Sequence, residues 1–181
     1  MTREVLIAGF GGQGVLSIGR TLAQAGLQEG YEVTWVPSYG PEMRGGTANC
    51  SVVLSNGPIG SPVVTHPGEL IAMNDPSIRK FADAVTPGGL VLVNASQTNL
   101  KVQREDVQVH YIPIMEEAQK LGNVRVANMV MLGAYIAATQ ALKMETIRDI
   151  LAQMFTGDKA PLVALNLQAL EVGAGYIQQE A

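Results

Sequence analysis

Short apolar segments alternate with longer amphipathic segments along the whole chain. Residues 4–8 read EVLIA, a short and mostly apolar run typical of strands buried on both faces of a parallel sheet. The longer segments instead repeat apolar residues every three or four positions, which indicates helices. We therefore expect strands at residues 4–8, 31–36, 47–54, 69–73, 90–94 and 107–112. We expect helices at residues 15–29, 76–85, 115–121, 128–142, 144–155 and 165–178.

This order of elements predicts an α/β fold. The expected architecture has three layers, around a doubly wound and mostly parallel sheet with a Rossmann-like glycine-rich first turn. The sequence contains no repeat, low-complexity stretch or linker that would divide it, so residues 1–181 are predicted to form a single domain. Residues 128–142 are apolar on nearly all sides, which predicts a helix buried on more than one side.

The first candidate site is the glycine-rich loop from Gly9 to Gly14. Glycines at this spacing allow a tight strand-to-helix turn, and the following helix N-terminus presents N–H groups to an anion. A nicotinamide site also needs an acid at the end of the second strand, whereas Glu32 lies near its start. A dinucleotide site is thus disfavoured, which leaves a simple turn or a loop that receives a phosphate or a partner. Gln13 is either a hydrogen-bond donor to such a ligand or a solvent-facing residue.

The second candidate site is the segment 38–46, SYGPEMRGG, which follows the second strand. We expect it on the same carboxyl edge as the first loop, where open α/β sheets bind ligands. Tyr39, Glu42 and Arg44 provide a phenol, a carboxylate and a guanidinium, and Arg44 is the strongest candidate for an anion contact. The three glycines leave room for a cofactor or another backbone. The alternative is a solvated turn with a local pair between Glu42 and Arg44.

Composition narrows the range of functions. Charged residues make up 15% of the chain, below the roughly 25% of a typical domain, which favours either assembly with partners or a large buried sheet. A net charge of −4 without a basic block argues against nucleic acid and anionic membranes as partners. The single cysteine, Cys50, cannot form an internal disulfide or hold a metal cluster alone, and His66 and His110 lack the spacing of metal ligands.

The remaining polar candidates have structural explanations. Asn128 is expected to cap the helix that follows it, and Cys50 is expected to behave as a small buried apolar residue. Since no nucleophile has a matching base nearby in the sequence, we expect no catalytic residue. The sequence shows neither a signal peptide nor an apolar run long enough to span a bilayer, so the expected compartment is the cytoplasm.

Three segments together match the motifs of a known protein family. They are the opening loop at residues 9–15, the segment 39–48 (YGPEMRGGTA), and the late helix beginning Asn128-Met129 and continuing through Leu132-Gly133-Ala134. In these motifs, and over essentially its whole length, the chain resembles the gamma subunits of 2-oxoacid:ferredoxin oxidoreductases. The resemblance is strongest to the 2-oxoglutarate type, with the branched-chain and pyruvate types close behind.

The resemblance implies an accessory subunit of an enzyme that converts a 2-oxoacid, expected to be 2-oxoglutarate, and coenzyme A into acyl-CoA and carbon dioxide while reducing ferredoxin. The implied partners are alpha and beta subunits, a ferredoxin-like delta subunit and, through the complex, ferredoxin. Thiamine diphosphate, Mg²⁺ and iron–sulfur clusters would lie in the partner subunits, with no cofactor bound by this chain alone. The isolated chain is expected to be inactive, and whether it forms a homodimer stays open.

Within such a complex the resemblance implies that this chain shapes or closes the coenzyme A side of the site. The residues expected to contact the cofactor or co-substrate come from the two glycine-rich segments: Gly9, Gly11, Gly12, Gln13, Gly14, Tyr39, Glu42, Arg44, Gly45 and Gly46.

Overall fold

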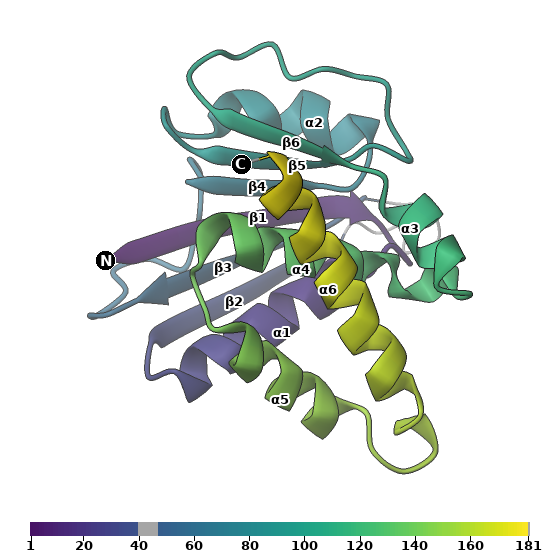
Figure 1. Cartoon of the computed structure of the whole chain (residues 1–181). Coiled ribbons are helices and arrows are strands. Elements are labelled where there is room, and N and C mark those ends of the chain that lie inside the picture. The colour runs from purple at the N-terminus through teal and green to yellow at the C-terminus, as the bar shows by residue number, and fades with distance from the viewer. Residues whose placement is uncertain (40–46, 181) are drawn as a thin grey trace.

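A mixed sheet forms the centre of the computed structural model, which describes residues 1–39 and 47–180. Its strands are β1 (Thr2–Phe10), β2 (Glu32–Tyr39), β3 (Thr47–Ser55), β4 (Glu69–Ala72), β5 (Leu90–Asn94) and β6 (Gln108–Ile112). They lie side by side in the order β2-β3-β1-β4-β5-β6 (Figure 1). β4, β5 and β6 continue parallel from β1, whereas β3 is antiparallel to both β1 and β2. The sheet is therefore mostly parallel, as predicted, with one reversed strand.

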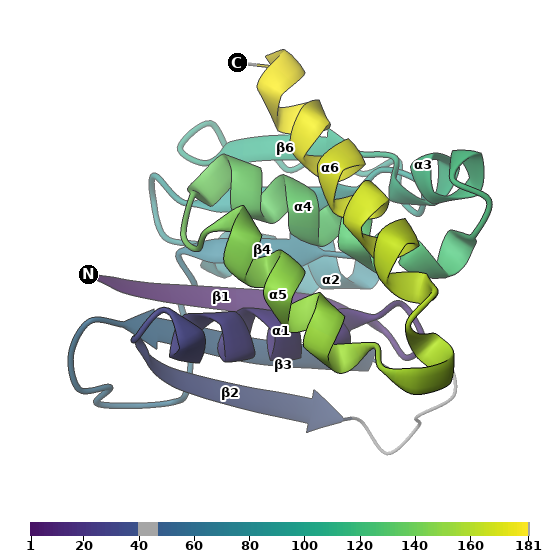
Figure 2. The same cartoon turned by 60° about the horizontal axis from the view of Figure 1, so that its bottom comes forward.

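Helices cover both faces of this sheet and produce three layers. The α-helices are α1 (Val15–Gln28), α2 (Asp75–Phe81), α3 (Ile114–Lys120), α4 (Ala127–Thr139), α5 (Met144–Met154) and α6 (Leu162–Glu180). Short 3₁₀ helices are η1 (Ala82–Ala84), η2 (Val124–Val126) and η3 (Gly157–Lys159). Figure 2 shows α1, α4, α5 and α6 in front of the sheet, with α2 behind it. The predicted three-layer α/β class is confirmed.

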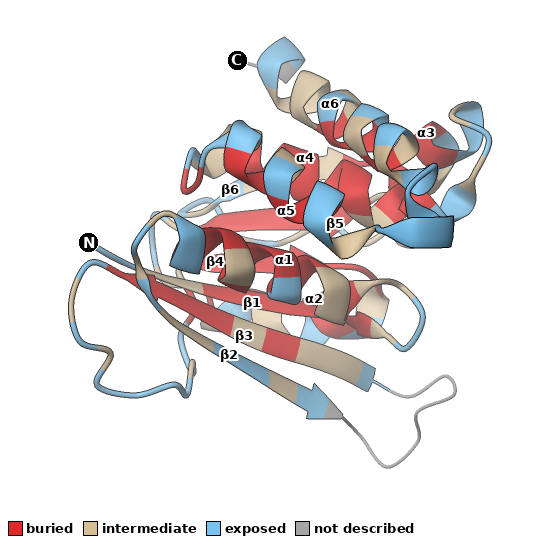
Figure 3. Ribbon diagram, turned by 90° about the horizontal axis from the view of Figure 1, so that it is seen from below, coloured by how far each residue is buried: buried red, intermediate tan, exposed pale blue. Residues whose placement is uncertain are grey.

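The apolar side chains of the strands divide between two cores. In β1, Val5 and Ile7 pack into the larger core under α1 and α4, while Leu6 between them packs into the smaller core under α2. β5 alternates in the same way, with Leu92 in the larger core and Val93 in the smaller. Successive strand side chains point to opposite faces, so both faces of these central strands are buried (Figure 3). This burial explains the unbroken apolar runs in the sequence.

Helix α4 is buried nearly all round, as its composition predicted. Every residue from Met129 to Ile136 is buried, because α4 lies between the sheet and the outer helix α6. In the described part of the chain, no helix combines the length and apolar character needed to cross a bilayer.

Candidate functional site

The carboxyl ends of the parallel strands meet at one edge of the sheet. Their register places Ala8 of β1 beside Ala72 of β4, Ala72 beside Val93 of β5, and Val93 beside Tyr111 of β6. The loops that leave these strands therefore lie next to one another. This is the edge at which open α/β sheets bind their ligands.

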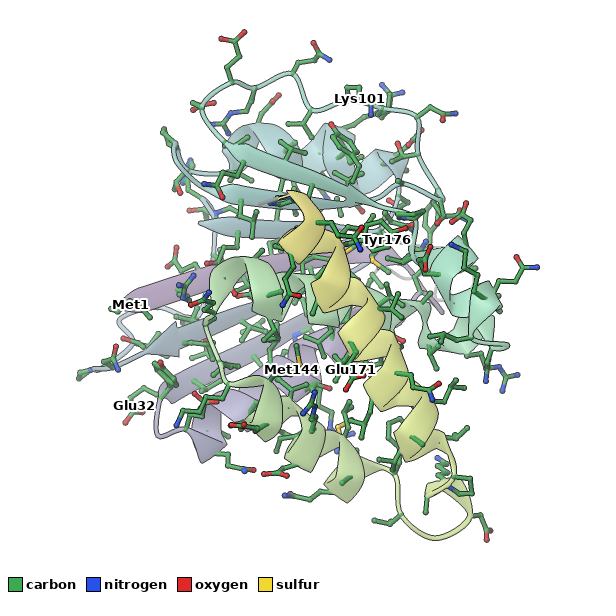
Figure 4. All side chains as sticks on the ribbon, in the orientation of Figure 1. Met1, Glu32, Lys101, Met144, Glu171 and Tyr176 are labelled. Carbon is green, nitrogen blue, oxygen red and sulfur yellow. The ribbon has the colours of Figure 1, made fainter. Side chains whose placement is uncertain are left out.

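Glu32, by contrast, lies at the other end of the sheet. It begins β2 and pairs with Ser55, which in turn pairs with Thr2 at the start of β1. Figure 4 shows Glu32 at the end of the sheet opposite α3. A carboxylate in that position cannot reach a ribose bound at the carboxyl edge, which agrees with the prediction against a dinucleotide site.

The glycine-rich loop turns sharply from β1 into α1. Gly12 and Gly14 have φ angles of +91° and +78°, in the left-handed region that glycine adopts without strain. The first of the described helical bonds of α1 runs from the Ile18 N–H to the Gly14 carbonyl, at 3.0 Å. The N–H groups of the preceding turn have no partner within the helix, and no acidic side chain occupies that turn. The start of α1 therefore carries positive partial charge at this edge.

Gln13 braces this loop against β4. Its side-chain oxygen accepts hydrogen bonds from the Phe10 N–H at 2.6 Å and from the Asn74 amide at 3.2 Å. Its side-chain nitrogen donates to the Met73 carbonyl at 3.1 Å. The structure thus gives Gln13 a role within the protein that neither sequence interpretation described. A ligand could use only its remaining amide hydrogen.

Gly9 has no room for a side chain beneath this brace. A Cβ atom there would lie 2.6 Å from the Gln13 Oε1 atom and 2.8 Å from the Met73 Cβ atom. The buried Asn94 at the end of β5 donates to the same Met73 carbonyl, at 3.1 Å. Two side-chain amides, one from the glycine loop and one from the end of β5, therefore hold the chain just after β4 in place.

A pocket of about 810 Å³ opens above this floor. It is lined by the glycine loop, the ends of β4 and β5, the start of α3 and the start of α4: Phe10, Gly11, Gly12, Gln13, Gly14, Met73, Asn94, Gln97, Ile114, Met115, Val124, Arg125, Ala127 and Asn128. Among these lining residues Arg125 supplies the one charged side chain. Together with the start of α1, this cation gives the pocket a positive electrostatic character suited to an anionic ligand.

Asn128 does not cap α4, which corrects the sequence interpretation. The helix begins at Ala127, directly after the 3₁₀ turn Val124–Val126. That turn is capped by Asn123, whose side chain accepts from the Arg125 N–H at 3.0 Å. Asn128 therefore lies inside the first turn of α4, and its side chain packs over Gly14 in the pocket.

The wall formed by α3 is tied to its surroundings on two sides. Ser96, after β5, accepts from the Met115 N–H at 3.0 Å and also bonds the Glu116 carboxylate. The Glu117 carboxylate accepts from Lys120 at 2.5 Å and from the hydroxyl of Tyr176 on α6 at 2.9 Å. The Lys120 bond, followed by the Tyr176 bond, holds the pKa of Glu117 below its ordinary value despite burial.

The second predicted segment falls largely outside the described residues. Its two ends are placed: Tyr39 at the end of β2 pairs with Ala48, and Phe10 at the end of β1 pairs with Thr47. The segment therefore leaves and re-enters the sheet at the edge that carries the glycine loop. The side chain of Tyr39 and all of Glu42, Arg44, Gly45 and Gly46 lie outside the described residues, so their roles stay predictions.

The structure adds pocket residues that the sequence did not single out. Arg125 lies in the mixed stretch LGNVRVAN, and the sequence shows no spacing that would connect it with the glycine loop. Only the packing of α4 against α1 brings residues this far apart to one pocket.

The matches to known proteins span most of this chain. The sequence profile described as pyruvate ferredoxin/flavodoxin oxidoreductase matches residues 4–176. The crystal structure of a keto/oxoacid ferredoxin oxidoreductase gamma subunit from Geobacter sulfurreducens PCA superposes with a TM-score of 0.84 at 27% identity. That superposition covers 98% of this chain and 99% of the other.

Two relatives differ in length and in the 2-oxoacid of their names. The ketoisovalerate oxidoreductase subunit VorA of Methanothermobacter thermautotrophicus is 44% identical over 97% of this chain, but the chain spans only 36% of that protein's length. The 2-oxoglutarate synthase subunit KorC of Methanocaldococcus jannaschii is 35% identical over 81% of this chain and 80% of its own. The identity is thus higher to a branched-chain relative than to a 2-oxoglutarate relative, and these values do not favour 2-oxoglutarate.

Proposed function

Because the chain belongs to the pyruvate ferredoxin/flavodoxin oxidoreductase family, we propose that it works as the gamma component of a thiamine-diphosphate-dependent 2-oxoacid:ferredoxin oxidoreductase. The assembled enzyme would convert one 2-oxoacid and coenzyme A into acyl-CoA and carbon dioxide. The two electrons released pass to ferredoxin. The proposed partners are the alpha and beta subunits and a ferredoxin-like subunit.

The electron-transfer and metal groups of this reaction do not fit the described part of this chain. Cys50 is buried, and burial raises the pKa of its thiol to about 11, so it does not offer the thiolate that iron–sulfur clusters require. The described residues contain no group of three or more metal-ligating side chains. In this proposal thiamine diphosphate, Mg²⁺ and the clusters are held by the partner subunits.

The contribution of this chain is to bind and orient coenzyme A at the glycine-rich edge. The observation that carries this proposal is the pocket in which Arg125 is the one charged side chain among the described lining residues, beside the start of α1, where the described residues provide no side-chain cap. The phosphate groups of coenzyme A are anions, which both features attract. The braced floor under Gln13 would hold the bound molecule in one position while its thiol reaches a partner's active site.

The test is a steady-state assay of the assembled complex carrying Arg125→Gln. We expect the KM for coenzyme A to rise roughly tenfold, as expected when a charged hydrogen bond is lost. The KM for the 2-oxoacid should not change. Arg79→Gln is the matched control, because Arg79 is an exposed arginine on α2, on the other face of the sheet. Equal KM values for coenzyme A in both variants would reject this role.

Assembly and substrate are tested separately. Purification of this chain from its source should bring down alpha and beta chains, and the isolated chain should show no activity and no saturable binding of NAD(H), NADP(H) or FAD. If the chain is a stable monomer that binds neither the alpha nor the beta subunit, the proposed subunit role is wrong. The complex should then be assayed with 2-oxoglutarate, ketoisovalerate and pyruvate, because the two relatives named above differ in this respect.

A further inference from the structure

The side-chain amide of Asn128 is poised in the pocket directly over the glycine loop. A Cβ atom built on Gly14 would lie 2.5 Å from the Asn128 Nδ2 atom and 2.6 Å from its Cβ atom. Position 14 therefore favours glycine for two reasons: its φ of +78° suits glycine, and the Asn128 side chain leaves no space for a Cβ atom. This contact fixes the Asn128 amide beside the start of α1.

Asn128 differs from the other inner amides of the pocket. Gln13 and Asn94 use their side chains to brace the floor, through the bonds to the Met73 carbonyl. Within residues 1–39 and 47–180, the half-buried Asn128 amide has no hydrogen-bond partner. Because this amide lines the pocket and is not committed to a bond within the described residues, its donor and acceptor atoms are available to a ligand there.

We propose that Asn128 is a ligand-binding residue, whose amide donates a hydrogen bond to a phosphate oxygen of the bound coenzyme A. This inference rests on the proposed function of the pocket. An anion is the expected acceptor because Arg125 lies one turn earlier in the same wall and none of the described lining residues is an acid. In this proposal Gly14 leaves room for the Asn128 side chain, and the Asn128 amide contacts the phosphate.

Two substitutions separate an anion contact from a neutral one. Asn128→Ala removes the amide, and we expect the KM of the assembled enzyme for coenzyme A to rise about tenfold. Asn128→Asp has nearly the same shape but places a carboxylate against the phosphate, and we expect a rise on the order of a hundredfold. In both variants kcat at saturating coenzyme A should stay within about twofold of wild type, because neither change touches the reacting thiol.

Thermal unfolding distinguishes this role from a structural one. The carboxylate introduced by Asn128→Asp would lie beside the positive start of α1, so the Tm of this variant should equal or exceed that of wild type while its KM rises. Pantetheine, which lacks phosphate groups, is the second probe. With pantetheine as acyl acceptor, all three forms should have the same KM.

The KM values of these variants decide between the two proposals. If Arg125→Gln raises the KM for coenzyme A but neither Asn128 variant does, the role of Asn128 is wrong and the proposed function stands. If the two Asn128 variants raise the KM equally, the assignment to a phosphate is wrong. If neither Arg125→Gln nor the Asn128 variants change the KM, the proposed function of the pocket fails together with this inference.

Discussion

Gly133 of α4 and Gly173 of α6 mark the point where these two helices touch backbone to backbone. A Cβ atom on Gly133 would overlap the backbone of Leu170, and a Cβ atom on Gly173 would overlap the Val130 carbonyl and approach the Ala134 nitrogen. Two glycines therefore allow α6 to lie on a helix that is already buried against the sheet. The contact explains why α4 is apolar on the side that faces away from the strands.

We predict that Gly173→Ala destabilises the protein by about 3 kcal/mol, because backbone atoms cannot move aside as a flexible side chain can. Gly175→Ala is the matched control: it lies in the same helix, and a Cβ atom there would meet nothing within 4 Å. We expect that control to stabilise α6 by roughly 0.5–1 kcal/mol, because alanine favours helix more than glycine does. Urea denaturation measures both, and a similar loss in the two variants would contradict close packing as the cause.

A buried polar cluster at the amino end of the sheet leads to a second prediction. The hydroxyl of the fully buried Tyr135 donates to the Glu69 carboxylate at 2.5 Å, and Arg3 forms an ion pair with the same carboxylate. Burial and the neighbouring Glu69 charge raise the pKa of Tyr135 well above its ordinary value, so the hydroxyl remains a donor. Tyr135→Phe should cost about 1–3 kcal/mol of unfolding free energy, because the carboxylate loses a buried donor.

The partner residue provides the control for this prediction. Adding Glu69→Gln to Tyr135→Phe should cost less than the sum of the two single changes, since both act on one bond. Strict additivity of the two losses in urea denaturation would show that the bond contributes nothing.

A third prediction concerns pH and the Glu117 carboxylate on the pocket wall. Its pKa is lowered in the folded protein, first by the bond from Lys120 and then by the bond from Tyr176. The folded state therefore binds the proton less tightly than the unfolded state. The resulting stabilisation is present above the unfolded pKa, about 4.3 for glutamate, and is lost as pH falls through the folded value.

Glu117→Gln should remove this dependence. Urea denaturation at about pH 7 and about pH 3.5 should show a larger stability difference between wild type and variant at the higher pH. A difference that stays constant or widens on acidification would contradict the assignment.

A fourth prediction concerns the thiol of Cys50 beneath α1. The thiol is buried, its pKa is raised to about 11 by burial, and its Sγ atom lies 3.6 Å from the Val15 carbonyl. Because the thiolate is the reactive form, the native protein should not react with iodoacetamide at neutral pH, whereas the urea-unfolded chain should take up one label. Mass spectrometry of the two samples gives the answer, and rapid labelling of native protein would contradict the burial.

The hydrophobic pattern predicted most of this fold. β5 has the predicted bounds, Leu90–Asn94, and α1 and α5 each end one residue before the predicted position. These elements carry strong local signals, because strands buried on both faces and helices with one buried face differ in periodicity. The reversal of β3 was not predicted, since an apolar strand reads the same in either direction.

The candidate site was predicted only where the chemistry is local in sequence. The glycine loop could be located because its turn and its helix start are neighbours along the chain. The brace by Gln13 depends on Met73 and Asn74, and the contact between Gly14 and Asn128 depends on the packing of α4. Such contacts between distant positions leave no periodic signal in one sequence. The prediction that Asn128 caps a helix is wrong for a local reason, because the turn Val124–Val126 starts the helix earlier.

The reversed strand β3 also bears on how this domain can vary among its relatives. Because β2 and β3 are antiparallel neighbours, Tyr39 and Thr47 both lie at the edge of the sheet where β1 ends in Phe10. Insertions, deletions or substitutions between these strands would leave the register of every strand pair intact. Relatives can therefore differ in length and sequence at this connection while they keep the same sheet.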